Sequence, residues 1–299
     1  MWIGIDAGGT FTDVVGFDPS TGALHVLKQP STPAAPAQAI LDGIRNLLAA
    51  TNKRGDAVQR VHHGTTIATN ALLQKRLART GMVTTAGFRD VLDIARQRRP
   101  HLFDLGVPKP DPIAPRALRI EIAERVGERG NVIRALEDND VRVAIASLRE
   151  SACEAVAICF LHAYANPAHE RRVKEHIERE WPEAMVCTSN DVLSEMREYE
   201  RFATTVVNAG LLPIMSQYLT DLSTGVRTLG IRCSPRIMQS NGGTVSTASA
   251  AERPVKTFVS GPAAGVIGSE QLSARLEAPN LITLDMGGTS TDVCVVSGG

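Results

Sequence analysis

Apolar and polar residues alternate in short runs at the start of the chain. Trp2–Asp6, Thr12–Phe17 and Ala23–Lys28 each have the two-residue period of a half-buried strand, and turn residues separate them. This pattern predicts a three-strand meander. In Pro36–Ala50 the apolar residues follow a helical period, which predicts an amphipathic helix. Strands that lead into a helix favour the α/β fold class.

The rest of the chain continues this alternation. Further strands are expected at Val58–His62, Thr80–Thr85, Ile120–Val126, Ala155–Leu161, Arg236–Gln239 and Leu281–Asp285. Helices are expected up to Leu73, at Arg134–Ser151, at Pro167–Trp181, in a long segment from Ser189 that contains Pro213, and from Phe258 to Ser269. In that long segment Arg197, Glu198, Glu200 and Arg201 have the spacing of ion pairs within a helix. Because the pattern changes near residue 190, we expect two domains, residues 1–188 and 189–299.

The composition indicates a globular protein without net charge. The 32 basic and 32 acidic residues cancel, and 43% of the 299 residues are hydrophobic. No net field attracts nucleic acid or anionic lipid, so we expect neither nucleic acid nor a membrane as a partner. The N-terminal sequence has no basic segment or long apolar run, which predicts a cytoplasmic protein. The five cysteines lack Cys-x-x-Cys spacing, which disfavours a zinc site or a disulfide framework.

An internal repeat is the most informative feature of the sequence. Ile5–Val15 reads IDAGGTFTDVV, and Leu284–Cys294 reads LDMGGTSTDVC. Seven of nine positions agree between Asp6–Val14 and Asp285–Val293, and ordinary composition makes such agreement by chance remote. Each copy is an apolar strand that ends at an aspartate, followed by a Gly-Gly turn and a second strand.

Both copies have the chemistry of a phosphate loop. Glycines permit positive φ and close approach of the backbone, so successive N–H groups can surround phosphate oxygens. Loop hydroxyls can donate to the same anion, and an aspartate at the strand end can bind the water shell of a Mg²⁺ ion that bridges the phosphates. The predicted phosphate-binding residues are Gly8, Gly9, Thr10, Thr12, Gly287, Gly288, Thr289 and Ser290, and the predicted metal-binding residues are Asp6 and Asp285.

A simple β-turn is the alternative for each loop, because aspartate and glycine are also common turn residues. Two copies, each between two predicted strands, favour a paired clamp on one nucleotide over two unrelated turns. The P-loop pattern Gly-x4-Gly-Lys-Ser/Thr and the Rossmann pattern Gly-x-Gly-x-x-Gly are absent from the sequence. Those two nucleotide-binding folds are therefore disfavoured.

Two facing hairpins of this kind are the arrangement of the actin-like ATPase superfamily, which the chain resembles. Segments between the loops narrow the resemblance to the hydantoinase A/oxoprolinase family. They are His63–Asn70 (HGTTIATN), Gly87–Leu92 (GFRDVL), Arg197–Arg201 with Thr204–Ala209, Met238–Gly243 (MQSNGG) and Ser260–Gly265 (SGPAAG). The resemblance implies duplicated ribonuclease-H-like lobes. The second lobe is expected to be truncated at the C-terminus, because the family's adenosine-binding glycine motif does not precede Gly299.

The same resemblance implies an ATP-dependent hydrolase that opens a cyclic amide, such as a hydantoin, 5-oxoproline or a similar lactam. Resonance makes an amide carbonyl a poor electrophile, and a phosphate on its oxygen removes that protection. Related members carboxylate ketones such as acetone and acetophenone, and the loops do not separate the two reactions. A non-catalytic ATP switch of the chaperone or filament kind is an alternative of another class. The implied partners are ATP, Mg²⁺, a small cyclic amide or ketone, and a hydantoinase B-type subunit or domain, within an oligomer.

The resemblance also assigns roles to single residues. Asp6 and Asp285 would organise Mg-ATP, and Asp292 would position or deprotonate the attacking oxygen. Asp13 is its counterpart in the first copy, and for both a turn-capping carboxylate is the alternative. The predicted substrate-contacting residues follow a strand, where side chains reach into a cleft; they are His63, Thr65, Thr66 and Asn70.

Overall fold

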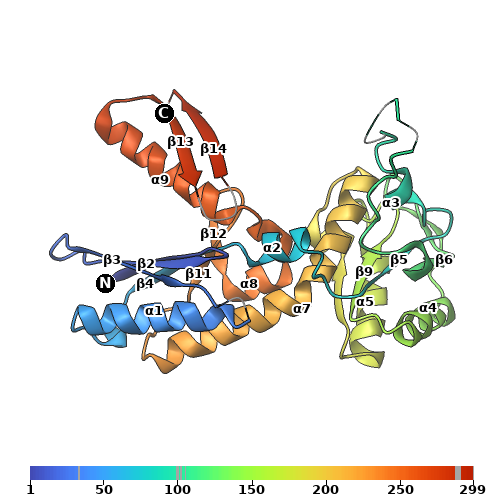
Figure 1. The fold of residues 1–299 in the computed structure, drawn as a ribbon. Helices are drawn as coiled ribbons and strands as arrows, with labels where there is room; N and C mark the ends of the chain where they lie inside the picture. The colour runs from blue at the N-terminus through green and yellow to red at the C-terminus, as the bar shows by residue number, and fades with distance from the viewer. Residues whose placement is uncertain (33, 99–100, 102, 105, 287–290, 299) are drawn as a thin grey trace. The chain divides into compact units, whose positions relative to one another are not determined.

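The computed structural model describes residues 1–299 except 33, 99, 100, 102, 105, 287–290 and 299. The chain forms two compact units (Figure 1). Unit 1 comprises Met1–Gln74 and Met215–Gly299, and unit 2 comprises Lys75–Ile214. Unit 1 therefore contains both ends of the chain, whereas the two predicted domains divide the chain once, after residue 188.

The main sheet of unit 1 has six strands in the order β12-β11-β4-β1-β2-β3. Strands β1 (Trp2–Ala7), β2 (Phe11–Phe17) and β3 (Leu24–Pro30) form an antiparallel meander, which confirms the predicted hairpin and its third strand. Strand β4 (Arg60–Thr65) pairs in parallel with β1. The short strands β11 (Arg236–Met238) and β12 (Thr244–Ser246) extend the sheet beyond β4.

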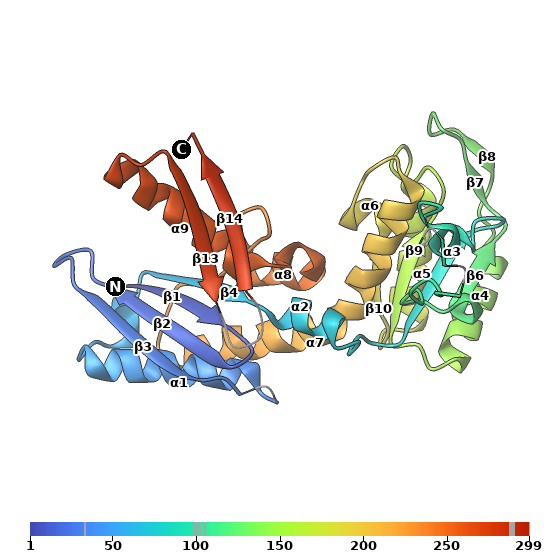
Figure 2. The same ribbon diagram turned by 45° about the horizontal axis from the view of Figure 1, so that its top comes forward.

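Helix α1 (Pro36–Ala50) covers one face of this sheet (Figures 1 and 2). Its buried stripe includes Ile40, Ile44 and Leu47, each with no exposed surface. Contact with β2 is close, since a Cβ added to Gly43 would lie 2.7 Å from Val14 Cγ2. The part of the long helix α7 (Glu198–Thr228) that belongs to unit 1 also contributes buried side chains. Pro213 lies inside this helix, as predicted.

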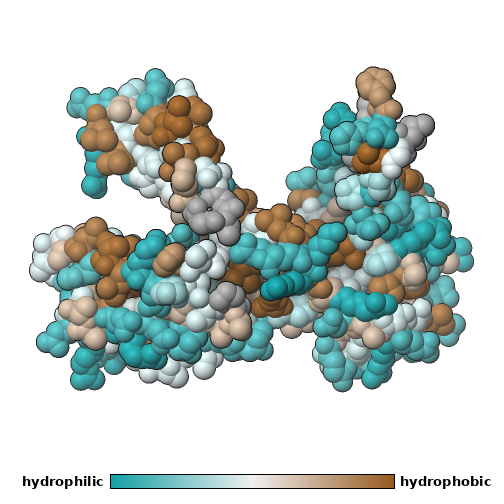
Figure 3. All heavy atoms as spheres, viewed as in Figure 1, coloured by the Kyte–Doolittle hydropathy of each residue, from teal (hydrophilic) through white to brown (hydrophobic). Residues whose placement is uncertain are grey.

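The repeat's second copy forms a separate hairpin. Helix α9 (Ser260–Leu276) leads to strands β13 (Asn280–Met286) and β14 (Thr291–Ser297), which make a two-stranded antiparallel sheet. This confirms the second predicted hairpin. Apolar side chains are exposed along it, as the brown area at the upper left of Figure 3 shows; they are Ile282, Leu284, Met286, Val293 and Val295.

Short helical elements complete unit 1. They are η1 (Gly55–Ala57), α2 (Ile67–Leu73), α8 (Thr247–Glu252) and η3 (Pro254–Thr257). The side chain of Ser246 caps α8 by accepting a hydrogen bond from the Ser249 N–H at 3.2 Å. Such a cap satisfies one of the free N–H groups of the first turn.

Unit 2 is built on a four-stranded parallel sheet in the order β10-β9-β5-β6. These strands are β5 (Thr80–Thr85), β6 (Arg119–Ile122), β9 (Ala155–Cys159) and β10 (Met185–Thr188). Helices α4 (Asp138–Glu150) and α5 (Ala168–Glu180) pack on it, and its smaller elements are α3 (Val91–Ile94), η2 (Arg116–Leu118), α6 (Ser189–Val192) and the hairpin β7 (Arg125–Val126) with β8 (Val132–Arg134). Strand β9 is buried at every position, as expected for a central parallel strand.

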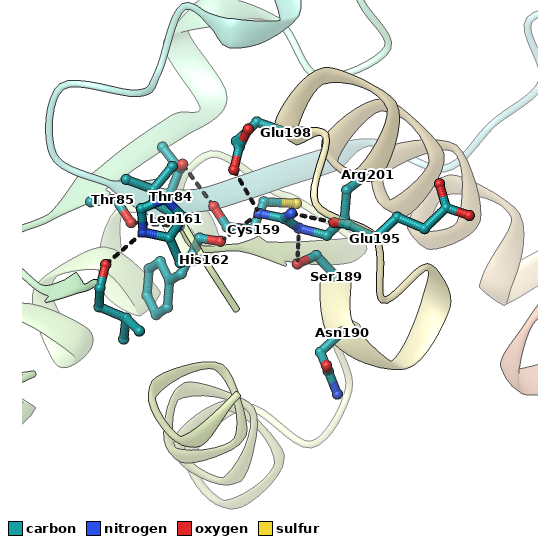
Figure 4. Close-up of polar contacts among 12 residues, drawn as sticks. Thr84, Thr85, Cys159, Leu161, His162, Ser189, Asn190, Glu195, Glu198 and Arg201 are labelled. Carbon is teal, nitrogen blue, oxygen red and sulfur yellow. Dashed lines mark hydrogen bonds and ion pairs between the residues drawn. The ribbon is translucent and has the colours of Figure 1, made fainter. Parts of the chain in front are cut away.

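A buried polar network joins the carboxyl ends of these strands to the start of α7 (Figure 4). The Arg201 guanidinium has no exposed surface and donates to Ser189 Oγ at 3.1 Å, to the Phe160 carbonyl at 3.0 Å and to the Glu195 carbonyl at 2.6 Å. Glu170, also fully buried, accepts from Ser189 Oγ at 2.6 Å. Burial raises the pKa of Glu170 to about 7, although its hydrogen bonds and Arg201 act in the opposite direction. Every charge in this network has a partner, as buried charges require.

Several predicted elements have different bounds in the structure, including the following three. The segment predicted as strand Ile120–Val126 contains two strands, β6 and β7, and the long helix begins at Glu198 instead of Ser189. The third correction is to β4, which continues to Thr65 beyond the predicted end at His62. Pairing with β1 and β11 extends β4 through residues whose side chains alone suggest a turn. Within the described ranges, every helix is too short or too polar to cross a lipid bilayer.

Candidate functional site

The first hairpin turn is held by backbone and hydroxyl groups. The Gly8 N–H donates to the Phe11 carbonyl at 3.0 Å, and Ser31 Oγ donates to the Gly8 carbonyl at 2.8 Å. Thr12 is buried, and its hydroxyl lies 2.9 Å from Ser31 Oγ. Gly9 and Thr10 remain exposed at the tip. Of the residues predicted to bind phosphate in this copy, Gly9 and Thr10 are therefore accessible to a ligand, whereas Thr12 supports the turn from inside.

Asp6 lies at the end of β1, between two glycines. In the sheet, Asp6 pairs with Gly64 of β4 on one side and Asp13 of β2 on the other. A Cβ added to Gly64 would lie 3.4 Å from Asp6 Oδ1, and a Cβ added to Gly261 of α9 would lie 3.1 Å from the same atom. Backbone without side chains thus surrounds the carboxylate on two sides. We name Asp6, Gly64 and Gly261 the aspartate cradle.

The cradle changes the electrostatics of Asp6. Although Asp6 is exposed on the surface, partial desolvation is the largest cause that raises its pKa, followed by the charges of Asp285 and Asp13; Lys28 acts in the opposite direction. The Asp285 charge thus contributes to the raised pKa of Asp6, although almost the whole chain separates the two residues. Carboxylates held together in this way favour a bound cation, because a cation relieves their repulsion.

The predicted substrate segment divides into buried and accessible residues. His63 and Thr65 were expected to follow the strand, and this is wrong, since both lie in β4 with no exposed surface. The His63 ring bonds through Nε2 to the Tyr218 hydroxyl, and burial lowers the pKa of His63 to about 4, with the Ile5 backbone acting in the opposite direction. His63 is consequently an uncharged interior residue near neutral pH. Its contact with substrate stays a prediction, and any such contact would first require its exposure.

Thr66 and Asn70, in contrast, are partly exposed beside the hairpin turn. Thr66 Oγ1 donates to the Ala7 carbonyl at 3.0 Å, and Asn70 Nδ2 donates to Thr66 Oγ1 at 3.2 Å. A Cβ added to Gly9 would lie 3.6 Å from Asn70 Nδ2. These two side chains therefore border the accessible turn of the first hairpin, and their predicted contact with substrate or phosphate stays a prediction.

The second hairpin repeats the carboxylate pair of the first. Asp285 and Asp292 lie directly opposite each other in the β13–β14 ladder, as Asp6 and Asp13 do in β1–β2. Asp13 has a salt bridge to Lys28 of β3 at 3.1 Å. The predicted phosphate-binding residues Gly287, Gly288, Thr289 and Ser290 lie outside the described residues. The two strands of this copy are therefore described, and phosphate binding by its turn stays a prediction.

The cradle suits a hydrated cation better than a fully protein-coordinated one. Among the described residues, no group of three or more histidine, cysteine, aspartate or glutamate side chains gathers as a metal site. Mg²⁺ usually keeps several waters and is held by one or two carboxylates together with substrate phosphates. Asp6 remains exposed to solvent, so a hydrated ion can reach its carboxylate. Asp6 and Asp285 are the residues that would hold the ion.

Sequence reasoning did not assign Gly64, Ser260 or Gly261 a place beside Asp6. Gly64 was expected beyond the end of its strand, and Ser260 and Gly261 were expected inside a helix and without contact to Asp6. One local signal was available for Gly64, because a glycine within an apolar strand often marks the close approach of another group. The approach of Gly261 depends on a contact distant in sequence, which no local pattern contains.

Two family models together match most of the chain. The sequence model of the hydantoinase/oxoprolinase N-terminal region matches residues 2–181, and the hydantoinase/oxoprolinase model matches residues 201–299. The caprolactamase subunit alpha of Pseudomonas jessenii is 35% identical over 99% of this chain and 43% of its own length. The 5-oxoprolinase of Saccharomyces cerevisiae is 35% identical over 97% of this chain and 25% of its own length.

Two solved structures superpose on the whole chain. The nucleotide-free structure of acetone carboxylase has a TM-score of 0.89 at 29% identity and covers 100% of this chain and 44% of that one. The crystal structure of ATP-dependent caprolactamase from Pseudomonas jessenii has a TM-score of 0.88 at 34% identity, over 99% and 43% of the two chains. The chain thus spans less than half the length of these relatives. On its sequence and its mixed α/β fold, the chain belongs to the hydantoinase/oxoprolinase family.

Proposed function

We propose that this chain is the ATP-handling part of an enzyme that opens a cyclic amide by phosphorylating its carbonyl oxygen. The observation that carries the proposal is the pair of like hairpins in unit 1, each with two aspartates opposite each other on its strands. It is supported by the contribution of the Asp285 charge to the raised pKa of Asp6. Relatives that are named as ATP-dependent enzymes support it. The proposal includes the finer fold assignment, in which each hairpin opens a ribonuclease-H-like lobe of an actin-like ATPase.

The chain's own residues explain how phosphate would be bound. The exposed turn at Gly9 and Thr10 offers backbone N–H groups and a hydroxyl to the anion, and Thr66 and Asn70 border that turn. Asp6 and Asp285 would hold Mg²⁺, which supplies neutralisation of the negative charge on the phosphates. Preorganised groups of this kind lower the barrier, because they need little rearrangement as charge develops.

The remaining chemistry concerns the attacking oxygen. In this proposal, Asp292 orients or deprotonates the oxygen that attacks, as a carboxylate at hydrogen-bond reach can do. Asp292 is half-buried opposite Asp285, so it is placed on the hairpin that bears the second metal-binding residue. Its equivalent Asp13 instead has a cationic neighbour, Lys28. This difference supports Asp292 over Asp13 for the catalytic role.

Carboxylation of a small ketone is the second candidate function. It is supported by the superposition on acetone carboxylase, and the acetone carboxylase beta subunit of Xanthobacter autotrophicus is 30% identical over 99% of this chain and 43% of its own length. Cyclic-amide hydrolysis is preferred because caprolactamase subunit alpha and 5-oxoprolinase each show 35% identity. Relatives that are named as subunits support a hydantoinase B-type partner for this protein.

The test is a substrate screen of the protein that carries this chain, with its partner subunit, ATP and Mg²⁺. ADP release is followed in the presence of hydantoin, 5-oxoproline and caprolactam, and separately with acetone or acetophenone plus bicarbonate. We expect ADP release that depends on a cyclic amide, together with a ring-opened product. ADP release with a ketone and a carboxylated product would instead establish the second candidate, and ATP hydrolysis indifferent to all of them would favour an ATP switch.

A further inference from the structure

The start of α9 is anchored by a set of hydroxyl groups. Ser260 has no exposed surface, and its hydroxyl donates to the Thr65 carbonyl at 3.1 Å and accepts from the Thr65 N–H at 3.2 Å. One side chain thus occupies both backbone groups of a residue at the end of β4. Just before it, the Val259 N–H donates to Thr69 Oγ1 at 3.3 Å, and Ser240 Oγ donates to the Phe258 carbonyl at 2.7 Å.

The backbone at this anchor is strained. Val259 has φ 50° and ψ 29°, the left-handed conformation, and half of its surface is exposed. A β-branched residue rarely adopts this conformation, because its Cβ substituents crowd the backbone. Strained residues persist where the surrounding contacts determine their conformation, and they gather at functional sites. Here the hydroxyl bonds on both sides of Val259 supply those contacts.

The anchor determines where Gly261 lies. Gly261 directly follows Ser260 and faces Asp6 Oδ1, while Gly64 directly precedes Thr65 and faces the same atom. The two glycines of the cradle are therefore joined through the Ser260–Thr65 hydrogen bonds. A movement of α9 away from β4 would open the cradle and change the surroundings of the Asp6 carboxylate.

We infer that Ser260 is a positioning residue, whose buried hydroxyl holds the first turn of α9 against β4 and so fixes the space in which Asp6 binds a hydrated divalent cation. The inference rests on the proposed function, since it assigns that cation to Asp6. It goes beyond that function in giving a role to a side chain that touches neither metal nor substrate. Residues that orient a metal ligand commonly change metal affinity by tenfold or more when they are removed.

The first experiment measures Mn²⁺ affinity without nucleotide, by electron paramagnetic resonance, in the protein that carries this chain. Ser260→Ala is compared with Ser269→Ala, a substitution in the same helix that removes only a hydroxyl bonded to the Gly265 carbonyl. We expect roughly tenfold weaker binding in Ser260→Ala and about unchanged binding in Ser269→Ala. Equal affinity in Ser260→Ala and the wild type would overturn the inference.

A second pair of variants decides the matter if Ser260→Ala folds poorly. A Cβ at Gly261 would meet Asp6 Oδ1 at 3.1 Å, whereas a Cβ at Gly265 meets nothing within 4 Å. Both changes replace a helical glycine by alanine, so neither lowers the helix propensity. Gly261→Ala should bind Mn²⁺ roughly tenfold more weakly and Gly265→Ala about as the wild type does. Equal affinities in these two variants would contradict the inference.

Hydrogen exchange separates the failure of this inference from the failure of the proposed function. The Thr65 N–H should exchange faster in Ser260→Ala, while the Thr66 N–H, which donates to the Ala7 carbonyl at 3.3 Å, should keep its rate. If Asp6→Asn binds Mn²⁺ as the wild type does, the proposed function fails. If Thr65 exchange is unchanged in Ser260→Ala, the tether itself is absent and the inference fails.

Discussion

Asp6 and Asp13 are the two aspartates of the first repeat copy, and their surroundings in the structure differ. They lie opposite each other on neighbouring strands. Asp6 faces the backbone of two glycines, and its pKa is raised by desolvation and by Asp285. Asp13 has a salt bridge to Lys28, whose side chain is 59% exposed. Of these two carboxylates, Asp6 is the one without a cationic partner of its own, so a bound cation would stabilise its charge.

We predict that Asp13→Asn has little effect on turnover and changes the free energy of unfolding by less than about 1 kcal/mol. An exposed salt bridge contributes little, because water screens it and two long side chains lose freedom. The substitution also removes the repulsion between Asp13 and Asp6, which offsets part of the stability lost with the salt bridge. Thermal unfolding and ADP release measure the two effects. A large loss of turnover in a folded Asp13→Asn protein would move the catalytic role from Asp292 to Asp13.

His63 predicts a pH dependence of stability. Its pKa is about 4 in the folded protein, against an ordinary value of 6.5. As the pH falls from 6.5 towards 4, the unfolded chain binds a proton that the folded protein resists, so the folded state loses stability at up to about 1.4 kcal/mol per pH unit. Above pH 6.5 the effect is absent.

The comparison is His63→Gln, which removes the titrating ring. Urea unfolding at pH 7.5, 6 and 5 should show a smaller decrease of stability with falling pH in this variant than in the wild type, whatever their difference at pH 7.5. Parallel decreases in the two proteins would show that His63 is protonated as easily in the folded protein as in the unfolded chain.

At the scale of elements, local patterns predicted where strands and helices lie better than where they end. Strand β5 and helix α1 have their predicted bounds, and in α1 the apolar residues follow a regular helical period. Strand β4 continues past its predicted end, since pairing with β1 and β11 decides it. Arg201 was predicted in an ion pair within the long helix. Arg201 lies 3.7 Å from Glu198 but is fully buried. A charged residue at helix spacing is usually expected on the surface, so the sequence did not predict this burial.

Arg201→Met should destabilise unit 2 strongly. The change leaves the Phe160 carbonyl and Ser189 without their donor and Glu170 without its cation. Removal of one partner from a buried charged network costs on the order of 3–5 kcal/mol. Arg197→Met is the matched control, because Arg197 is exposed in the same segment and such changes cost about 0.5 kcal/mol or less. Similar melting temperatures for the two variants would show that the network contributes no more than a surface arginine.

At the scale of the whole molecule, the sequence predicted the α/β class and both hairpins, and the structure confirms them. The sequence did not predict how the chain divides into its two units. Strands β11 and β12 join the sheet of β1–β4 although more than half the chain lies between them, and such pairing leaves no local pattern. The aspartate cradle was not predicted for the same reason, since Gly64 and Gly261 come from segments that are distant in the sequence.

The most direct test of the account is a double-mutant cycle on Asp6 and Asp285, with substrate-dependent ADP release as the readout. If both residues hold one metal-nucleotide complex, Asp6→Asn and Asp285→Asn should each lower turnover on the order of a hundredfold or more while the protein stays folded. The double variant should then be little worse than either single one, because residues that act as a unit are not additive. Near-normal turnover in either single variant, or losses that multiply in the double variant, would contradict a shared site.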